Sequence, residues 1–220
     1  MSYKLILFDL DETLYDGNTG LWAAIKENIN QYMIQRLHIP VEEVRALREE
    51  LFNQYGTTMR GLAETRNLDK MDYLKFVHDL PIDKFLAPDP ELRTMLEKYA
   101  VKKVIFTNAD ASHAERVMRT LKVRDLFEDT IVDIMSIDPL CKPMPEAFSI
   151  ARQLTGNLPV NEIVFVDDSL PNILSAHQLG FQVIWLNKKN QVLENPGFPV
   201  ISHIHELQQC LPLPNGSMPC

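Results

Sequence analysis

YKLILFDLDETLYDG, residues 3–17, is the stretch of sequence that decides the fold. Its first part, from Tyr3 to Phe8, is rich in Leu, Ile and Phe and is followed by acidic residues and a glycine. A short apolar run bounded in this way is typical of a β-strand that is buried on both faces. Asp9 and Asp11 follow this strand, at the carboxyl end where open α/β sheets bind their ligands.

Asp9 and Asp11 are separated by one residue, so an extended chain projects both carboxylates to the same side. One carboxylate could then attack a phosphorus atom and form an aspartyl-phosphate, while the other moves protons. Two carboxylates that face a phosphate dianion need a cation between them, and this hypothesis therefore requires Mg²⁺. The alternative is that the pair only caps the junction between a strand and a loop.

The composition is that of an ordinary globular protein. A chain of 220 residues can form one well-buried core and a second small module. Charged residues make up 24% and hydrophobic residues 45%, and no apolar run approaches the ~20 residues of a membrane span. We expect no membrane contact and no signal peptide. The three cysteines, Cys141, Cys210 and Cys220, lack the spacing of a metal site, so a reducing, cytoplasmic location is expected.

The charge pattern narrows the class of partner. The net charge is −8, and the sequence has no cluster of Lys and Arg of the kind that a polynucleotide requires. A nucleic acid polymer is therefore excluded as a partner. A small anionic substrate stays compatible with the sequence, because a metal ion and a lysine in the site can override the overall negative charge.

Helical spacing of apolar residues dominates the chain between the first strand and the next. Prolines at 81 and 88 then mark a linker. Three amphipathic helices are predicted, over residues 21–37, 41–55 and 69–77, the last with Asp69 as its N-cap. We call residues 16–85 the helical insert, because they form an all-helical segment that interrupts the β-strands.

Strands and helices alternate after the helical insert. Strands are predicted at 103–106, 131–134, 163–166 and 183–186, with helices that begin at Asp89 and Pro145, a helix capped by Ser112 and Glu115, one around Ile173, and a short one at 204–210. This alternation indicates a parallel sheet with right-handed crossovers. The predicted organisation is a core domain at 1–15 and 86–210, the helical insert as a second domain at 16–85, and a flexible tail at 211–220.

Polar side chains follow three of the predicted strands. Asp9 and Asp11 follow the first strand, Thr107 and Asn108 the second, and Asp167 and Asp168 the fourth. A Thr hydroxyl with exposed backbone amides can bind a phosphate oxygen, and an acidic pair on a neighbouring strand can complete an oxygen-rich Mg²⁺ shell. Taken alone, Thr107 is equally compatible with a simple strand terminator.

Lys142 is the remaining candidate. A phosphoryl-transfer site needs a fixed cation to neutralise the charge that spreads over the equatorial oxygens. Taken alone, a lysine before Pro143 is equally compatible with an ordinary surface residue.

Four segments of this sequence resemble, in order and spacing, the signature motifs of the haloacid dehalogenase-like phosphohydrolases. They are Asp9 to Tyr15, Thr107-Asn108, Lys142-Pro143 and Val166-Asp167-Asp168-Ser169. The resemblance implies an α/β fold with a Rossmannoid three-layer core and a parallel sheet of strand order 5-4-1-2-3. It also implies that the helical insert is a mobile cap over the site.

The same resemblance assigns roles to the residues of the motifs. Asp9 would be the nucleophile, and Asp11 the acid/base that protonates the leaving alcohol and then activates water. Thr107 and the Asn108 backbone would bind the phosphoryl group, with Lys142 bridging it to Asp9. Dehalogenase members lack a second acid two residues after the nucleophile, so Asp11 favours phosphate chemistry. The Mg²⁺ ligands would be an Asp9 oxygen, the Asp11 backbone carbonyl, Asp168, and Asp167 directly or through water.

Segments of the helical insert and of the core further resemble the pyrimidine 5'-nucleotidase branch of this family. They are Tyr55 to Leu62, Val77-His78-Asp79, Phe106 to Ala109 and His113-Ala114. This resemblance implies a nucleoside monophosphate such as UMP or CMP as the substrate. Arg60 could meet a phosphate or a pyrimidine carbonyl, and the glycines at 56 and 61 permit close approach or bending. The alternative is a plain helix–helix connection with a solvated Arg60.

Other functions stay open at this point. The same chemistry could act on a different small phosphorylated metabolite, such as a sugar phosphate, phosphoglycolate or pyridoxal phosphate. A phosphomutase would shield the phospho-enzyme from water. An inactive binding protein with this fold is a remote alternative, because Asp9, Asp11, Thr107, Lys142 and Asp168 are all present. A monomer and a homodimer are equally compatible with the sequence.

Overall fold

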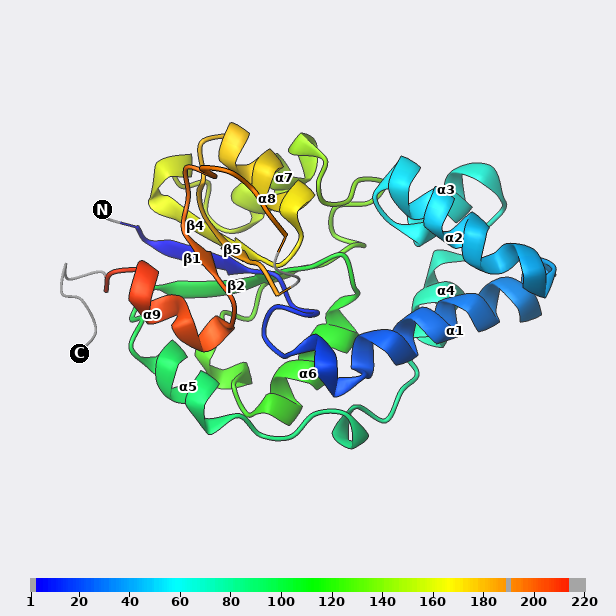
Figure 1. Ribbon diagram of the computed structural model, residues 1–220, viewed down its shortest axis with the longest axis horizontal. Helices are drawn as coiled ribbons and strands as arrows, with labels where there is room; N and C mark the ends of the chain where they lie inside the picture. The colour runs from blue at the N-terminus through cyan, green and yellow to red at the C-terminus, as the bar shows by residue number, and fades with distance from the viewer. Residues whose placement is uncertain (1–2, 189–190, 214–220) are drawn as a thin grey trace.

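The computed structural model describes residues 3–188 and 191–213 and contains a six-stranded parallel sheet (Figure 1). The order of the strands is β3-β2-β1-β4-β5-β6. The predicted order of the first five strands is confirmed, and β6 adds a strand at one edge. The strands are β1 (Leu5–Phe8), β2 (Lys102–Phe106), β3 (Ile131–Val132), β4 (Ile163–Asp167), β5 (Gln182–Leu186) and β6 (Val200–Ile201).

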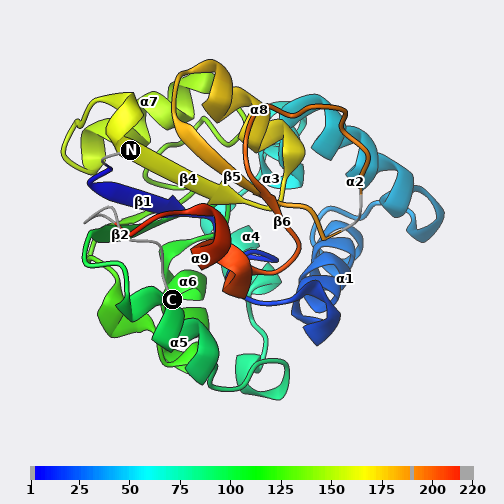
Figure 2. The ribbon, with the colours of Figure 1, turned by 60° about the vertical axis from the view of Figure 1, so that its left-hand side comes forward.

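Four helices cover the two faces of the sheet: α5 (Pro90–Glu97), α6 (Ala111–Leu121), α7 (Pro145–Leu154) and α8 (Leu170–Gln178). Figures 1 and 2 show α7 and α8 on one face and α5 and α6 on the other, which makes three layers. Along β1, Leu5 and Leu7 pack with α7 and α8, whereas Ile6 and Phe8 pack with α5 and α6. All four side chains are fully buried, which explains the continuous apolar run at the start of the sequence.

The helical insert contains helices and turns and no strand in any of its residues, all of which the structure describes. Its helices are α1 (Leu21–Gln35), α2 (Val41–Tyr55), α3 (Thr58–Thr65) and α4 (Lys70–Val77), with short 3-10 turns at Gly17–Thr19 and Ile82–Lys84. The Asp69 carboxylate accepts hydrogen bonds from the backbone N–H groups of Met71 and Asp72, so this residue is the N-cap of α4 as predicted. In Figure 1 the insert lies at the right, beyond one end of the sheet.

Helix α3 is absent from the sequence-based prediction, which treated this segment as a connection. It is only eight residues long and contains Gly61, which lowers helix propensity by ~1 kcal/mol relative to alanine. Thr57 nonetheless caps the helix, because its hydroxyl accepts a hydrogen bond from the backbone N–H of Arg60 at 3.1 Å. A Cβ at position 61 would lie 2.8 Å from Cβ of Leu51, so the glycine allows α3 to approach α2 closely.

The start of α6 differs from the prediction of a capping box at Ser112 and Glu115. The N-cap is Asp110, whose carboxylate accepts a hydrogen bond from the backbone N–H of His113. Glu115 instead pairs with Arg124 at 2.7 Å. An aspartate two positions before Ser112 competes for the same cap, and an ionised carboxylate is the stronger acceptor.

The C-terminal part of the described chain adds one edge strand and a short helix. β6 is two residues long and follows a segment without periodicity, which is why the sequence does not reveal it. The helix predicted at 204–210 is present as a 3-10 turn, Ile204–Glu206, followed by α9 (Leu207–Cys210). Leu211, assigned to the tail by the sequence, is buried, and its carbonyl accepts a hydrogen bond from the Tyr99 hydroxyl. Residues 214–220 of the predicted tail lie outside the described residues.

The helices of residues 3–188 and 191–213 include none that is both long enough and apolar enough to cross a lipid bilayer. Cys141 and Cys210 are both free thiols, the first of them buried. Cys220, the third cysteine of the sequence, lies outside the described residues.

The packing of α3 on α2 predicts an unusual response to Gly61→Ala. In an exposed helix this change stabilises by ~1 kcal/mol. Here the new methyl group meets Leu51 and Tyr55, and overpacking of this kind costs about 1 to 3 kcal/mol. We therefore expect a lower melting temperature, by a few degrees for a chain of this length. Thermal unfolding followed by circular dichroism measures it, and an increase in melting temperature would contradict the packing argument.

Candidate active site

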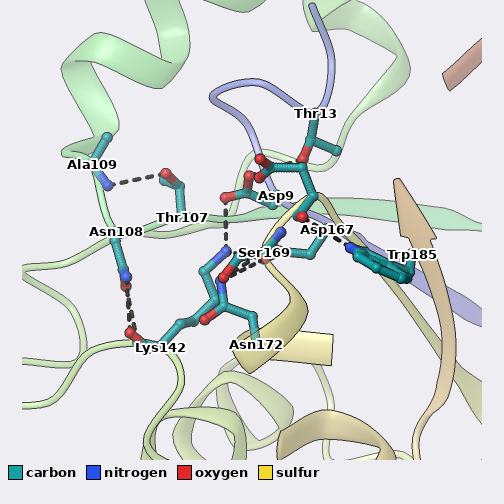
Figure 3. A network of polar contacts seen from close by, with 11 residues as sticks. Asp9, Thr13, Thr107, Asn108, Ala109, Lys142, Asp167, Ser169, Asn172 and Trp185 are labelled. Carbon is teal, nitrogen blue, oxygen red and sulfur yellow. Dashed lines mark hydrogen bonds and ion pairs between the residues drawn. The ribbon is translucent and has the colours of Figure 1, made fainter. Parts of the chain in front are cut away.

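The carboxyl ends of β1, β2 and β4 meet at one edge of the sheet because these strands are neighbours in the order β2-β1-β4. Asp9 follows β1, Thr107 follows β2, and Asp167 ends β4. All three side chains are buried, with exposed fractions of 7%, 1% and 0%. Figure 3 shows them around a common space, with Lys142 reaching in from a separate loop.

Lys142 lies between two carboxylates at the centre of this cluster. Its Nζ is 2.7 Å from Oδ1 of Asp9 and 2.7 Å from Oδ2 of Asp167, and the side chain is 1% exposed. Burial by itself would lower the pKa of Lys142, but the charges of Asp167 and Asp9 outweigh it and raise the pKa. The lysine is therefore a fixed, buried cation, and the surface alternative is wrong.

The Asn108 side chain holds the loop that carries Lys142. Its Oδ1 accepts a hydrogen bond from the backbone N–H of Lys142 at 2.9 Å, and its Nδ2 donates to the backbone carbonyl of Lys142 at 3.0 Å (Figure 3). The sequence analysis assigned only the backbone of Asn108 to phosphate binding. Two reciprocal hydrogen bonds from one amide fix both the position and the direction of the lysine backbone.

Thr107 and its neighbours form a tight turn at the end of β2. The Thr107 hydroxyl accepts a hydrogen bond from the backbone N–H of Ala109 at 3.0 Å. The hydroxyl proton is then free to be donated to another acceptor in the cluster. A simple strand terminator would not explain why this side chain is 1% exposed and lies beside the buried carboxylates (Figure 3).

Asp9, Asp167 and Asp168 each offer a carboxylate oxygen to one small region, and these oxygens lie within 4.8 Å of one another. Burial raises the pKa of Asp9 to about 7, opposed by Lys142 and reinforced by Asp167. Burial, followed by the charges of Asp167 and Asp9, raises the pKa of Asp168 to about 8. One lysine does not neutralise three carboxylates, and oxygen donors are the ligands that Mg²⁺ prefers. The residues present therefore fit a hard divalent cation.

The three carboxylates differ in how much of their hydrogen-bonding capacity is already used. The Asp167 carboxylate accepts hydrogen bonds from Lys142 and from the backbone N–H of Ser169. Nδ2 of Asn172 also donates to both of its oxygens, at 3.1 Å to Oδ1 and 3.0 Å to Oδ2. The Asp168 carboxylate, by contrast, accepts no hydrogen bond from any residue that the structure describes, although its backbone carbonyl accepts one from Trp185. Asp168 and Asp9 therefore suit direct contact with a cation, and Asp167 mainly holds Lys142.

Asp11 lies in a separate polar group beside the cluster. Its Oδ1 accepts a hydrogen bond from the Tyr15 hydroxyl at 2.7 Å and lies 2.8 Å from Nε2 of His113. Burial alone would raise the pKa of Asp11, but the charge and hydrogen bond of His113 and the hydrogen bond of Tyr15 lower it. The sequence analysis gave His113 no role, although it appears in one of the segments that resemble the nucleotidase branch.

Arg60 does not lie in the cluster of buried carboxylates. Its Nε donates to the backbone carbonyl of Pro139 at 3.0 Å, and its Nη1 donates to the carbonyl of Tyr55 at 3.1 Å. It is thus not a freely solvated side chain. The contacts of Arg60 instead tie α3 to the loop that carries Lys142.

A second group of contacts joins the same two segments. The Cys141 thiol donates to the carbonyl of Tyr55 at 3.3 Å. A Cβ at Gly56 would lie 2.9 Å from Sγ of Cys141 and 3.2 Å from the carbonyl oxygen of Lys142. The connection between α2 and α3 therefore rests directly on the loop of Lys142, and only glycine allows this approach.

The sequence is similar to those of two phosphate-related proteins. The chain is 30% identical over 191 residues to phosphate metabolism protein 8 of Saccharomyces cerevisiae, and the match covers 80% of this chain and 59% of the yeast protein. It is 27% identical over 205 residues to glyceraldehyde 3-phosphate phosphatase of Pyrococcus abyssi, covering 83% of this chain and 80% of that protein. This chain thus spans about three fifths of the length of the yeast relative.

Solved structures share the fold. A HAD phosphatase from Thermococcus onnurineus superposes with a TM-score of 0.65 and 20% sequence identity, over 100% of both chains. The sequence model of haloacid dehalogenase-like hydrolases matches residues 3–180 of this chain. That match, together with the sheet order and the residues gathered at the strand ends, shows that the chain belongs to the haloacid dehalogenase-like hydrolases.

Proposed function

We propose that the protein is a Mg²⁺-dependent phosphomonoester hydrolase that forms an aspartyl-phosphate on Asp9, with a pyrimidine nucleoside 5'-monophosphate, UMP or CMP, as its substrate. The observation that carries the proposal is the pairing of Asp9 with the buried Lys142 beside a separately held Asp11. A nucleophile, a fixed cation and an acid/base are the three protein groups that this chemistry requires.

The surroundings of Asp9 suit a carboxylate nucleophile. Its Oδ1 contacts Lys142, and its Oδ2 accepts a hydrogen bond from the Thr13 hydroxyl at 2.9 Å. These two contacts fix the plane of the carboxylate, which removes part of the entropic cost of attack. A carboxylate oxygen attacks phosphorus, a P–O bond forms, and the bond to the ester oxygen breaks.

Asp11 handles the protons of both half-reactions. In the first, it gives a proton to the ester oxygen, which leaves as an alcohol. In the second, its carboxylate takes a proton from the water that attacks the phosphorus of the aspartyl-phosphate, and Asp9 is restored. An ionised Asp11, favoured by His113 and Tyr15 in the free site, is the form that the second half-reaction needs. A phosphate dianion bound nearby raises the pKa of the Asp11 carboxyl, so that Asp11 takes up a proton before the first half-reaction begins.

The remaining groups bind the phosphoryl oxygens and balance charge. Lys142 contacts Asp9 and Thr107 lies beside it (Figure 3), so both adjoin the region where the charge of the transferring group would develop. Asp9, Asp168 and the backbone carbonyl of Asp11 would hold Mg²⁺, with Asp167 in contact through water. When bound, Mg²⁺ neutralises charge on the phosphoryl oxygens and lets an anionic substrate approach the carboxylates.

Cleavage of a carbon–halogen bond is supported less well by this site. A halide leaves as a stable anion and needs no proton, so the first half-reaction would require no general acid. This chain nevertheless holds Asp11 in a defined position with two hydrogen-bond partners. An oxygen leaving group is the kind that such a residue serves.

The pyrimidine nucleotide is supported by the segments of the helical insert that resemble the nucleotidase branch. A second candidate is the same reaction on another small phosphorylated metabolite, such as a sugar phosphate, phosphoglycolate or pyridoxal phosphate. It is supported by the relative from Pyrococcus abyssi, which is named as a glyceraldehyde 3-phosphate phosphatase. Both candidates use the same residues of the core, and they differ in the groups that contact the alcohol part of the ester.

Phosphate release from a panel of esters tests the proposal. We expect chelator-sensitive hydrolysis of UMP and CMP, with AMP, GMP, a sugar phosphate, phosphoglycolate and pyridoxal phosphate hydrolysed more slowly. Asp9→Asn should lower kcat by at least about a hundredfold and keep the fold, because the amide is isosteric and a poor nucleophile. Selective hydrolysis of other esters would discard the nucleotide and keep the mechanism. Release of phosphate from none of them would favour a mutase or an inactive binding protein.

The raised pKa values of Asp9 and Asp168 predict a pH-dependent stability of the metal-free protein. Both pKa values lie above the ordinary value of 3.8, at about 7 and about 8. The folded protein therefore binds more protons than the unfolded chain, so stability falls as pH rises toward 8. Saturating Mg²⁺, at a hundred times its Kd, should restore about 2.7 kcal/mol, or roughly 5 to 10 °C.

Thermal unfolding at pH 5.5 to 8.5, with EDTA and with Mg²⁺, measures this effect. The shift caused by Mg²⁺ should grow with pH, because cation and protons compete for the same carboxylates. Asp168→Asn is the matched control. It should reduce both the dependence of the melting temperature on pH and the increase in melting temperature caused by Mg²⁺. A shift that is independent of pH, or equal in Asp168→Asn, would argue against a cation at this position.

Arg60 is proposed to contact the substrate through Nη2, the nitrogen that donates to no residue within the described ranges. Arg60→Ala should then change the ratio of kcat/KM values between UMP and phosphoglycolate by about tenfold. Lys70→Ala is the control, because Lys70 also ties the helical insert to the loop of Lys142, through Asp138. If both variants lose the same fraction of kcat/KM on the two esters, Arg60 only holds α3 against the loop of Lys142 and does not contact the substrate.

A further inference from the structure

We propose that His113 and His78 are positioning residues for Asp11: a buried stack of Asp110, His78 and His113 holds Oδ1 of Asp11 and reserves Oδ2 for the proton. This inference rests on the proposed function, because it concerns the acid/base of that reaction. None of these three residues belongs to the four core motifs; His113 lies on α6, and Asp110 is the N-cap of that helix.

Both hydrogen-bond partners of Asp11 bind the same oxygen. The Tyr15 hydroxyl and Nε2 of His113 contact Oδ1 at 2.7 and 2.8 Å. Oδ2 has no hydrogen-bond partner among the described residues. A carboxylate that is held at one oxygen by two donors cannot rotate freely, so its second oxygen keeps one direction. Oδ2 is therefore the oxygen available to exchange a proton with the ester oxygen or with water.

The hydrogen bond to Asp11 defines the tautomer of His113. A carboxylate only accepts, so the proton must reside on Nε2. In the neutral ring Nδ1 then carries the lone pair, and this atom is buried without a partner among the described residues. A buried lone pair without a donor costs less than a buried N–H without an acceptor. The surroundings thus favour the tautomer that donates to Asp11.

The ring of His113 is held in place by His78. The two imidazole rings stack with their centroids 4.3 Å apart and their planes at 17°. Both side chains are buried, with exposed fractions of 1% and 8%. The stacked neighbour limits the tilt of the His113 ring and so restricts the direction in which Nε2 points, which a single hydrogen bond would not do.

Asp110 organises the stack from the N-terminus of α6. Its Oδ1 accepts a hydrogen bond from the backbone N–H of His113 at 2.9 Å, and its Oδ2 contacts Nδ1 of His78. One carboxylate thus caps the helix that carries His113 and also orients the ring that stacks on it. Loss of Asp110 would release both histidines.

His78 belongs to the helical insert, directly after α4, whereas His113 and Asp110 belong to the core. Arg116 fixes this junction, because its Nη1 donates to the carbonyl of His78 at 2.8 Å and its Nη2 donates to the carbonyl of Leu80. The acid/base is therefore held by a structure to which both parts of the chain contribute. The docking of this junction on α6 therefore supports the position of Asp11, together with the Tyr15 hydroxyl.

The nature of the leaving group separates a positioning role from a general structural one. An alkyl phosphate needs a proton on its leaving oxygen, whereas p-nitrophenyl phosphate releases a stable phenolate that does not. The parameter kcat/KM reports the steps up to the loss of the leaving group, which is the half-reaction in which Asp11 donates. A poorly positioned Asp11 should thus impair kcat/KM for the alkyl ester alone.

We expect His113→Leu to lower kcat/KM about 10- to 100-fold for the best alkyl ester of the panel and less than threefold for p-nitrophenyl phosphate. His113→Gln, which keeps an N–H donor, should recover part of the loss. His78→Leu should also impair the alkyl ester selectively, with a smaller loss of kcat/KM than His113→Leu. Asp11→Asn should impair it selectively with a larger loss. His205→Gln is the control and should retain both activities, because His205 pairs with Asp89 and not with Asp11.

Equal losses on the two esters in His113→Leu and His113→Gln would overturn the positioning role, as would a wild-type value for both variants. If His113→Leu does not fold, the comparison of His113→Gln with wild type still decides, because the selectivity is a ratio measured within one protein. Absence of hydrolysis by the wild-type enzyme would instead refute the proposed function, so the two failures are distinguishable.

Discussion

The ammonium group of Lys142 is removed from water and held between the carboxylates of Asp9 and Asp167, and much of the site depends on this contact. Burial of a lone charge is costly, and removal of one partner from a buried ion pair destabilises a folded protein by ~3 to 5 kcal/mol. The cost is offset only because both oxygens of Asp167 are hydrogen-bonded and because Asn108 holds the lysine backbone. Through these contacts Lys142 joins its own loop to Asn108, after β2, and to Asp167, at the end of β4.

This arrangement divides the acidic residues by task. Both oxygens of Asp167 accept hydrogen bonds from neighbouring residues, and this carboxylate forms an ion pair with Lys142. The Asp168 carboxylate, in contrast, accepts no hydrogen bond from the described residues. Asp9 shares one oxygen with Lys142 and the other with Thr13. Asp11 is held apart by Tyr15 and His113. Four similar side chains within a short distance thus have four different environments, and environment is what sets the chemistry of a carboxyl group.

The sequence predicts the features that depend on neighbouring residues. The buried run of β1, the N-cap Asp69 and the polar groups at three strand ends are all local, and the parallel sheet follows from their order. Helix α3 was missed because Gly61 opposes a helix locally and is justified only by Leu51 across the interface. The contact of His113 with Asp11 joins residues 102 positions apart, and no periodicity reveals it.

The connection between α2 and α3 rests on the loop of Lys142, with Gly56 against Cys141 and Arg60 on the carbonyl of Pro139. This contact has a consequence for how the family can diversify. A helical insert that acted as an independent module could be exchanged between relatives to alter what is bound and leave the reaction unchanged. Here an exchanged insert would also displace the backbone of the buried lysine. A chimera that keeps the buried lysine in place must therefore carry the loop along with the helices.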